Sequence, residues 1–405
     1  MAQKTRRTAP VFLFVVIAVF AAAAVWFWWT RQQQVTAALR LTPVSFDALP
    51  GWRDGDPRAA LAAFVRSCSA LVKQEPGIAM GGAGYAGTAG DWTPVCRTAQ
   101  QTANSSAEAR AFFESAFVPF AVNANSDPGL FTGYYEPELR VSARRHGPYQ
   151  TPIYALPDDL ITADLGQFKD SLAGERVTGR VEGHKLVPYP SRAAIDANGL
   201  PQARVLAWGD DPIAVFFLHI QGSGRALLED GTAVRIAYAG QNGRPYTPVG
   251  RTLIHEGAMA RSDLSMQGIR AWLLAHPGEA QRVMETDASY VFFDEKPLGD
   301  PALGATGSEG VPLMPGASLA VDRTVHPLGV PLWLALDAHA TALPRDRLMV
   351  AQDTGGAIKG AVRGDVFFGF GSKAEWNAGH MKAAGAMFVL LPKALAARLP
   401  AGFTA

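Results

Sequence analysis

Two aspartates near the C-terminus, Asp353 and Asp365, stand at the ends of apolar segments in a glycine-rich stretch. The apolar run Leu348 to Ala351 predicts a buried strand that ends at Asp353, and Asp365 opens a second apolar strand, Val366 to Phe370. Because an apolar wall disfavours the charged form of a carboxyl, we expect the pKa of Asp365 to be raised. A general acid that works near neutral pH needs this property. The alternative is a glycine-rich hairpin with two surface acids.

Several other chemistries are excluded by the sequence patterns. The eight histidines form neither an HExxH nor an HxH pair, so we expect no metal site. Ser223 lies in Gly222-Ser223-Gly224, which is not a GxSxG nucleophile elbow. No phosphate-binding or dinucleotide-binding glycine motif is present, so we expect no cofactor. The formal net charge is +1 without a basic block, which argues against nucleic acid as a partner. Carboxylate chemistry remains, and with aromatic and polar glycine loops it indicates a glycan.

Two further segments carry side chains suited to sugar. The segment Phe131 to Pro137 holds Thr132, Tyr134 and Tyr135, and tyrosine offers a flat apolar face and a hydroxyl. The alternative is a core strand with tyrosine packing. The apolar run Ile213 to His219 predicts a buried strand that leads into a polar glycine turn. That turn consists of Gln221, Gly222, Ser223, Gly224 and Arg225.

The N-terminus has the pattern of a membrane anchor. Lys4, Arg6 and Arg7 precede an uncharged apolar run over residues 11–29, close to the ~20 residues that a spanning helix needs. Cations ahead of such a run keep the start in the cytoplasm and place the rest outside. The alternative is a cleaved signal peptide, because Ala21 to Ala24 offer small residues.

The exported part predicts a mainly β body with few helices. Helices are expected after Asp56-Pro57 and after Ser105, where Glu108 completes a capping box. Residues 140–294 read as β segments with one helical patch, Leu264 to Glu285, broken at Pro277. From Gly310 onward, short strands with glycine turns favour a small barrel. Cys68 and Cys96 can form a disulfide in an exported protein, or Cys68 can be a buried free thiol.

Seven motifs occur in an order that resembles the membrane-bound lytic murein transglycosylase A family. They are FTGYYEP, QGSGR, YAGQNGRPYTPVGR, SYVFF, VPLMPGASLAVDR, HPLGVPLWL and AQDTGGAIKG with the glycines that follow it. The C-terminal part resembles the 3D domain, whose three aspartates are here Asp322, Asp353 and Asp365. The chain departs from the family's lipoprotein pattern, because an apolar anchor replaces the lipidated cysteine.

The resemblance implies a double-psi β-barrel domain with a second, inserted β-barrel domain and a glycan groove between them. The barrel domain is expected over 56–137 and 296–405, with its 3D part at about 310–385, and the inserted β domain over 138–295. A cytoplasmic start, 1–10, an anchor, 11–29, and a linker, 30–55, come before them.

The resemblance also implies the reaction. Asp365 matches the family's catalytic acid and base, which cleaves the β-1,4 MurNAc–GlcNAc bond of peptidoglycan from chain ends and forms 1,6-anhydro-MurNAc. Asp353 and Asp322 would be supporting acids, and Lys359 would either bind a substrate oxygen or pair with Asp353. Expected partners are glycan strands, the inner membrane and cell-wall synthesis complexes, with the catalytic body in the periplasm. The alternatives are a hydrolytic muramidase with a second carboxylate and a non-catalytic glycan-binding barrel.

Overall fold

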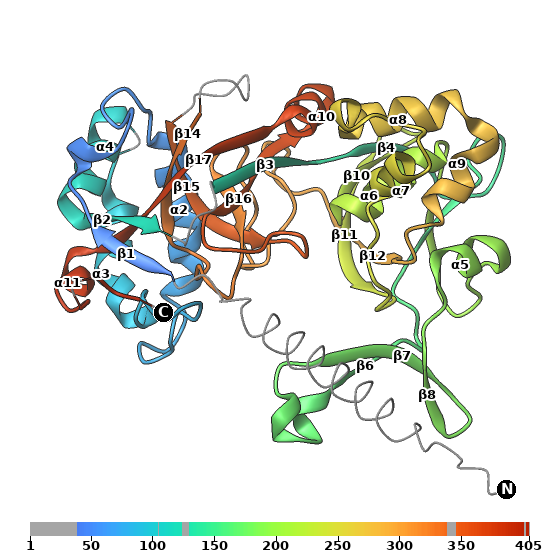
Figure 1. Ribbon diagram of the computed structural model, residues 1–405, viewed down its shortest axis with the longest axis horizontal. Helices are drawn as coiled ribbons and strands as arrows, with labels where there is room; N and C mark the ends of the chain where they lie inside the picture. Colours follow the sequence, from blue (N-terminus) through green and yellow to red (C-terminus); the bar gives the residue numbers. More distant parts are fainter. Residues whose placement is uncertain (1–38, 104, 124–128, 338–345, 401, 405) are drawn as a thin grey trace, which may run out of the picture.

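The computed structural model describes residues 39–103, 105–123, 129–337, 346–400 and 402–404. The expected anchor at 11–29 lies outside these residues. Within the described ranges, no helix has the length and apolar character needed to cross a bilayer. The strands belong to three sheets, and the mainly β fold predicted from the sequence is confirmed (Figure 1).

The first sheet closes on itself. Six strands follow one another in the order β17, β14, β15, β13, β16 and β3, and β3 also pairs with β17, which completes a ring. Leu319, Val350 and Val366 are fully buried in the core of this sheet. Its strands are β1 (Arg40–Pro43), β2 (Phe117–Asn123), β3 (Gly129–Glu136), β13 (Ser318–Val321), β14 (Pro331–Leu336), β15 (Asp346–Thr354), β16 (Arg363–Phe370) and β17 (Lys382–Pro392). The ring is the small barrel that the short C-terminal strands predicted.

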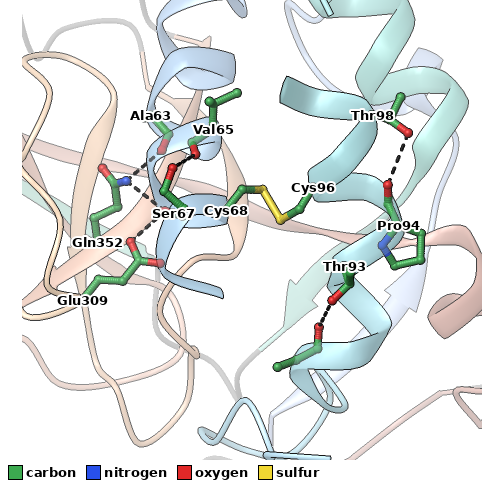
Figure 2. Close-up of a disulfide and its surroundings, with 12 residues drawn as sticks. Ala63, Val65, Ser67, Cys68, Thr93, Pro94, Cys96, Thr98, Glu309 and Gln352 are labelled. Carbon is green, nitrogen blue, oxygen red and sulfur yellow. Dashed lines mark hydrogen bonds between the residues drawn. A yellow bond between two sulfur atoms is a disulfide. The ribbon is translucent and has the colours of Figure 1, made fainter. Parts of the chain in front are cut away.

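Helices from the N-terminal part pack against one side of this ring, at the left of Figure 1. They are η1 (Phe46–Ala48), α2 (Arg58–Leu71), α3 (Ala89–Gln101) and α4 (Ser106–Ala116), and α11 (Lys393–Ala396) joins them from the C-terminus. α2 begins one residue after Pro57, and the Ser105 side chain caps α4 by accepting from the Glu108 amide, as predicted. Figure 2 shows the disulfide between Cys68 of α2 and Cys96 of α3, with the two Cα atoms 5.2 Å apart.

The second sheet has six strands in the order β12, β11, β10, β4, β9 and β5. A single bridge between Ala155 and Phe293 connects its two edge strands. The strands are β4 (Glu138–Ser142), β5 (Thr151–Tyr154), β9 (Val205–Gly209), β10 (Gly224–Leu228), β11 (Ala233–Gln241) and β12 (Val291–Pro297). β10 and β11 form the predicted hairpin around Asp230-Gly231.

A third sheet extends from the second one at the bottom of Figure 1. It consists of β6 (Ile161–Asp164), β7 (Arg176–Glu182) and β8 (Lys185–Pro188), with the short helices η2 (Leu165–Gln167) and η3 (Asp170–Leu172). At the top of the figure, α10 (Gly371–His380) packs on β3 and β16 and reaches α8 (Met266–Ala275), so it links the ring to the second sheet's helices.

The predicted strand at Ile213 to His219 is wrong, because this segment belongs to helix α6 (Pro212–Gln221). The Asp211 side chain accepts a hydrogen bond from the Ile213 amide at 2.8 Å, and Pro212 occupies the first turn. Gly222, with φ 79°, ends the helix in the left-handed conformation. The helix is apolar on most sides because it is buried on most sides, so its sequence lacks the helical periodicity that the prediction relied on.

The prediction of a single helical patch between residues 140 and 294 is also wrong. The segment contains α5 (Arg192–Asn198), α6, α7 (Val249–His255) and η4 (Arg261–Asp263) in addition to the patch itself. The patch forms α8 (Met266–Ala275) and α9 (Pro277–Met284), and the break at Pro277 is confirmed.

Candidate active site

Asp353 and Asp365 lie on either side of the same residue in the ring. Ala320 of β13 is in register with Asp353 of β15 on one side and with Asp365 of β16 on the other. Adjacent strands are about 4.8 Å apart, so the two Cα atoms are separated by about 9–10 Å. Residues in register project to the same face of a sheet, which brings both carboxylates to one face of the ring.

Asp365 is positioned by its neighbour in β3. The Thr132 hydroxyl donates a 2.5 Å hydrogen bond to Asp365 Oδ1 and accepts one from Arg363 Nη2 at 2.8 Å. Burial raises the pKa of Asp365 above its ordinary value, and the charge of Asp353 acts in the same direction. The hydrogen bond from Thr132 and the charge of Arg363 offset part of this rise in the pKa of Asp365. The result is a carboxyl that holds its proton more tightly than a surface aspartate, as its apolar neighbours predicted.

Asp353 is held by three donors. The Tyr134 hydroxyl donates to Oδ2 at 2.9 Å, and the amide and hydroxyl of Ser308 donate to Oδ1 at 3.0 and 2.9 Å. An ionised carboxylate has about four acceptor sites, so three of them are filled within the protein. Asp353 is therefore fixed in place and has little remaining capacity to activate a water molecule.

Asp322 has a structural environment. It is 5% exposed, and its oxygens accept from the Gly360 amide at 2.9 Å and from the hydroxyl of Thr324 at 2.7 Å. Burial alone would raise the pKa of Asp322, but these hydrogen bonds more than offset it and the pKa is lowered. The Lys359 ammonium lies 4.0 Å from Asp322 Oδ1, and the Lys359 side chain is 68% exposed. The sequence left two roles open for Lys359, contact with a substrate oxygen or pairing with Asp353. In the structure Lys359 lies beside an acid, but this acid is Asp322 and not Asp353.

A cavity of about 990 Å³, which we call the groove cavity, lies between the ring and the second sheet. Five residues of the predicted set line it: Tyr134, Gln221, Gly222, Ser223 and Asp353. Thr132 and Asp365 are not in its lining, but they lie two residues along β3 and β16 from the in-register pair Tyr134 and Phe367. The lining also includes Tyr238 and Gln241, which belong to the motif YAGQNGRPYTPVGR but were not predicted as site residues. Lys296 and Ser308 line it too, and they lie outside the seven motifs.

Three residues predicted to contact the glycan are instead buried. Tyr135 is 5% exposed and packs against Ala374 and Ala378 of α10, because successive residues of a strand point to opposite faces. At Gly224 an added Cβ would lie 2.6 Å from the Leu218 side chain, so this glycine serves close packing. Arg225 is 4% exposed and its guanidinium lies 3.2 Å from the Phe370 ring centroid. None of the three lines the groove cavity, and the structure assigns them to packing.

Arg225 belongs to a buried ionic cluster that joins the two main sheets. Glu136, at the end of β3, is 1% exposed and lies 3.1 Å from Arg225 Nε and 3.4 Å from Arg235 Nη1. Arg225 Nη2 donates to the carbonyls of Pro301 and Leu303 at 3.0 and 2.9 Å. The cluster therefore fixes part of the wall of the groove cavity, where Leu303 is a lining residue. Glu136 was not predicted as functional, although it lies in the same motif as Tyr134.

A second buried polar group lies behind Asp353. Gln352 donates through Nε2 to the Ala63 carbonyl and to the Ser67 hydroxyl, both at 2.9 Å, and Ser67 donates to Glu309 Oε2 at 2.7 Å (Figure 2). The Glu309 amide donates to the Gln352 carbonyl at 3.1 Å. Ser308 binds Asp353 and directly precedes Glu309 in the chain. The network therefore anchors the loop that contains both residues to α2, next to the disulfide. Burial raises the pKa of Glu309 to about 7.

The raised pKa of Glu309 predicts that the protein loses stability as pH rises. A carboxyl with a raised folded-state pKa stabilises the fold below its unfolded pKa, here about 4.5, and this contribution is lost as pH rises through about 7. We expect this group to lower the free energy of unfolding by about 2–4 kcal/mol between pH 5 and pH 8. Glu309→Gln stays neutral, so its urea denaturation curves at pH 5 and pH 8 should differ less than those of the wild type. Equal pH dependence in both proteins would contradict the assignment.

Tyr134 is predicted to contribute directly to glycan binding. Its ring packs against Phe367 with centroids 5.2 Å apart, and it lines the groove cavity. Tyr134→Ala should weaken glycan binding by about 1–3 kcal/mol, the scale of a large apolar contact. Calorimetric titration with a chito-oligosaccharide measures this loss. Tyr134→Phe is the control, because it keeps the ring and removes only the hydroxyl bound to Asp353, and unchanged affinity in Tyr134→Ala would argue against the contact.

Comparisons with known proteins identify the same family that the seven sequence motifs resemble. Two family models match the chain, the MltA specific insert domain over residues 130–294 and the 3D domain over 317–391. The crystal structure of membrane-bound lytic murein transglycosylase from Agrobacterium tumefaciens is 36% identical, with a TM-score of 0.78, and the match covers 88% of this chain and 99% of that chain. The structure of Escherichia coli MltA with bound chitohexaose is 26% identical, with a TM-score of 0.63, over 87% of this chain and 94% of that chain.

A curated relative gives a similar result over a shorter range. Membrane-bound lytic murein transglycosylase A of Escherichia coli K12 is 35% identical over 268 residues, which are 64% of this chain. The match spans 65% of the length of that relative.

Proposed function

The chain belongs to the family of membrane-bound lytic murein transglycosylases A, and we propose from this that it cleaves the β-1,4 MurNAc–GlcNAc bond of peptidoglycan with formation of 1,6-anhydro-MurNAc. The observation that carries the proposal is the environment of Asp365. Its carboxyl has a raised pKa, is oriented by Thr132, and lies beside the groove cavity. These are the properties of a general acid that must hold a proton near neutral pH and then release it.

Asp365 would act twice in this reaction. Oδ1 accepts the hydrogen bond from Thr132, so the transferable proton is on Oδ2. The acid gives this proton to the glycosidic oxygen as the bond to C1 breaks, and the departing sugar leaves with a hydroxyl. The resulting carboxylate then takes the proton of the C6 hydroxyl of the same MurNAc, whose oxygen bonds to C1. No water is consumed, and the internal nucleophile has a high effective molarity.

The surroundings of Asp353 support a single catalytic acid. Ordinary glycosidases use a second carboxylate as nucleophile or as base for water. Asp353 is engaged by Tyr134 and Ser308, and Asp322 by Gly360 and Thr324, so both suit supporting roles. Developing positive charge on the sugar ring would still be stabilised by the negative charge of Asp353.

One observation favours a second candidate, a hydrolytic muramidase. Asp353 and Asp365 project to the same face of the ring, so a second carboxylate is available near the scissile bond, as in ordinary glycosidases. Digestion of purified sacculi followed by mass spectrometry separates the two reactions. A transglycosylase releases anhydro-muropeptides, a hydrolase releases products heavier by one water, and a non-catalytic glycan-binding barrel releases neither. Products that carry only hydrated ends would refute the proposal.

Family membership also supports a proposal for the substrate and the location. A relative was crystallised with chitohexaose, a chain of the same β-1,4 linkage, and the groove cavity of this chain offers an aromatic and polar lining for such a strand. We propose that the enzyme acts from chain ends in the bacterial cell envelope, anchored in the inner membrane through residues 11–29, where it can meet cell-wall synthesis complexes. The relatives' names include "membrane-bound". Sequencing the mature N-terminus decides between an anchor and a cleaved signal peptide.

A further inference from the structure

A second cavity, of about 880 Å³, lies among helices α5, α6, α8 and α9 beside the second sheet. Within the described part of the chain it shares no lining residue with the groove cavity. Its volume falls in the range of ~300–1,000 Å³ that is usual for sites of small ligands. The proposed cleavage reaction makes no use of it.

The floor of this cavity carries polar groups that are not fully used by the protein. His219 is 5% exposed, and its Nδ1 accepts from the Val291 amide at 3.2 Å, so the proton is on Nε2. Burial lowers the pKa of His219 well below its ordinary value, which keeps the ring neutral. The Tyr290 ring lies against His219 with centroids 4.3 Å apart. Both residues line the cavity, and within the described ranges their hydrogen bonds use only His219 Nδ1 and backbone atoms, so His219 Nε2 and the Tyr290 hydroxyl are available to a ligand.

A buried cation adjoins these donors. The Arg192 guanidinium lies 4.9 Å from the Phe216 ring centroid and 5.1 Å from that of Tyr290. Two of its nitrogens donate to the carbonyls of Asp287 and Ser289, and Asp287 Oδ2 is 3.9 Å away. Arg192 is therefore fixed in position and adds positive potential to the floor. Arg145, at the exposed mouth, lies 5.4 Å from the Trp208 ring centroid and adds a second cation.

Asp196 is the titratable acid of the cavity. It lies one turn after Arg192 on α5, so both side chains project from the same face of the helix. Asp196 is itself solvent-exposed, but desolvation by the surrounding side chains raises its pKa to about 6, while the Arg192 charge lowers it and the Glu285 charge raises it. The charged and titratable groups that face Asp196 are Arg192, Glu285, Tyr154 and Tyr290. The other acid in the lining, Asp211, is paired with Arg270 at 2.8 Å.

These features together select a ligand class. The walls are apolar, with Ile213, Leu273 and Met284 among the lining, which suits small aliphatic groups better than a sugar with hydroxyls on every side. The floor presents hydrogen-bond donors and a cation, which suit an anion. We propose that this cavity is a second binding site, which takes the carboxylate end of a short peptide with small apolar side chains.

The source of such a peptide rests on the proposed function. Peptidoglycan carries short peptides on its glycan strands, and these end in D-alanine, which combines a methyl group with a free carboxylate. Binding a peptide end away from the groove would let the enzyme hold the polymer at a second point while Asp365 acts on the glycan. The second contact would raise the effective concentration of the strand at the groove.

Calorimetric titration of the full chain with N-acetyl-D-alanyl-D-alanine tests the proposal. We expect one binding site for this free acid and at least about tenfold weaker binding of its C-terminal amide, which lacks the negative charge. A bound carboxylate favours the protonated form of Asp196, so the affinity should fall as pH rises through about 6. The L-alanyl enantiomer distinguishes the peptide ends of peptidoglycan from those of an ordinary protein chain.

Three variants locate the site. Tyr290→Phe should weaken binding of the free acid about tenfold by removing one hydrogen bond, without leaving a cavity. Asp196→Asn should remove the pH dependence. Asp170→Asn, an exposed acid on η3 outside the cavity, is the matched control and should change neither. All three should release saccharides that end in 1,6-anhydro-MurNAc from peptide-free glycan strands at the wild-type rate.

Four results would overturn the proposal: no binding of the free acid at millimolar concentration, equal binding of acid and amide, displacement of the peptide by chitohexaose, or equal binding of the free acid by Tyr290→Phe and the wild type. Displacement by chitohexaose would indicate a second glycan site. Failure of the proposed function is seen separately, because a protein that binds the peptide but releases no anhydro products keeps the site and loses the reaction.

Discussion

Replacing Asp365 with asparagine is expected to give a folded protein that binds glycan strands and turns over almost none. Asparagine keeps the shape of the side chain, and its Oδ1 can still accept the hydrogen bond from Thr132. It cannot donate a proton to the departing sugar oxygen or take one from the C6 hydroxyl, so both halves of the reaction lose their catalyst. General acid–base help is typically worth about 10²–10⁴-fold per step, and we expect a loss at or beyond the upper end.

The other two aspartates provide the comparison. Asp353→Asn and Asp322→Asn replace an acceptor-only carboxylate by an amide whose NH₂ group faces existing donors, such as the Ser308 hydroxyl or the Gly360 amide. These variants should therefore lose stability along with activity. Sacculus digestion is measured for all three variants beside their melting temperatures. If Asp365→Asn keeps about a tenth or more of the wild-type activity while Asp353→Asn is folded and inactive, Asp353 is the acid and the assignment fails.

The raised pKa of Asp365 could be predicted from the sequence because its cause is local. Asp365 precedes an apolar strand, and this placement alone predicts a raised pKa. The strand boundaries near Asp353 and Asp365 also depend on neighbouring residues, and the structure places them within two residues of the prediction, because β15 ends at Thr354 and β16 begins at Arg363. At Ser105 the side chain caps α4 as predicted, but the Glu108 carboxylate accepts from the Ser105 hydroxyl and not from its backbone amide, so the capping box is only half formed. Local patterns could not show that Ala320 places both acids on one face, because this depends on pairing across three strands.

The errors have a common cause in burial. The segment Ile213 to His219 is apolar because α6 is buried, and its helical start at Asp211-Pro212 was a weaker signal than the apolar run. Arg225 was placed in the groove because it follows a polar glycine turn, yet its partner Glu136 lies 89 residues away in sequence. Ser308 binds Asp353 from a loop without any motif, so only the folded chain reveals it.

Removing the Glu136 carboxylate is expected to cost about 3–5 kcal/mol of folding free energy, the largest loss of stability that we predict. Glu136→Ala would leave Arg225 and Arg235, which are 4% and 6% exposed, buried without their counter-charge. Burial already raises the pKa of Glu136, so desolvation is not fully offset even in the intact cluster. Urea denaturation of Glu136→Ala measures the loss. Glu138→Ala, two residues along the chain and exposed, is the matched control and should change stability little.

Replacing the whole cluster separates its role in folding from its role at the groove. A triple variant with methionine at positions 136, 225 and 235 removes every unpaired charge, so it should recover most of the stability that Glu136→Ala loses. Activity should not recover, because Arg225 and Arg235 also donate to the carbonyls of Leu298, Pro301 and Leu303, which border the groove cavity or lie beside its lining. The expected result is a stable protein with weakened glycan turnover. A triple variant that is as active as the wild type would show that the cluster serves folding alone and that the groove wall holds its shape without it.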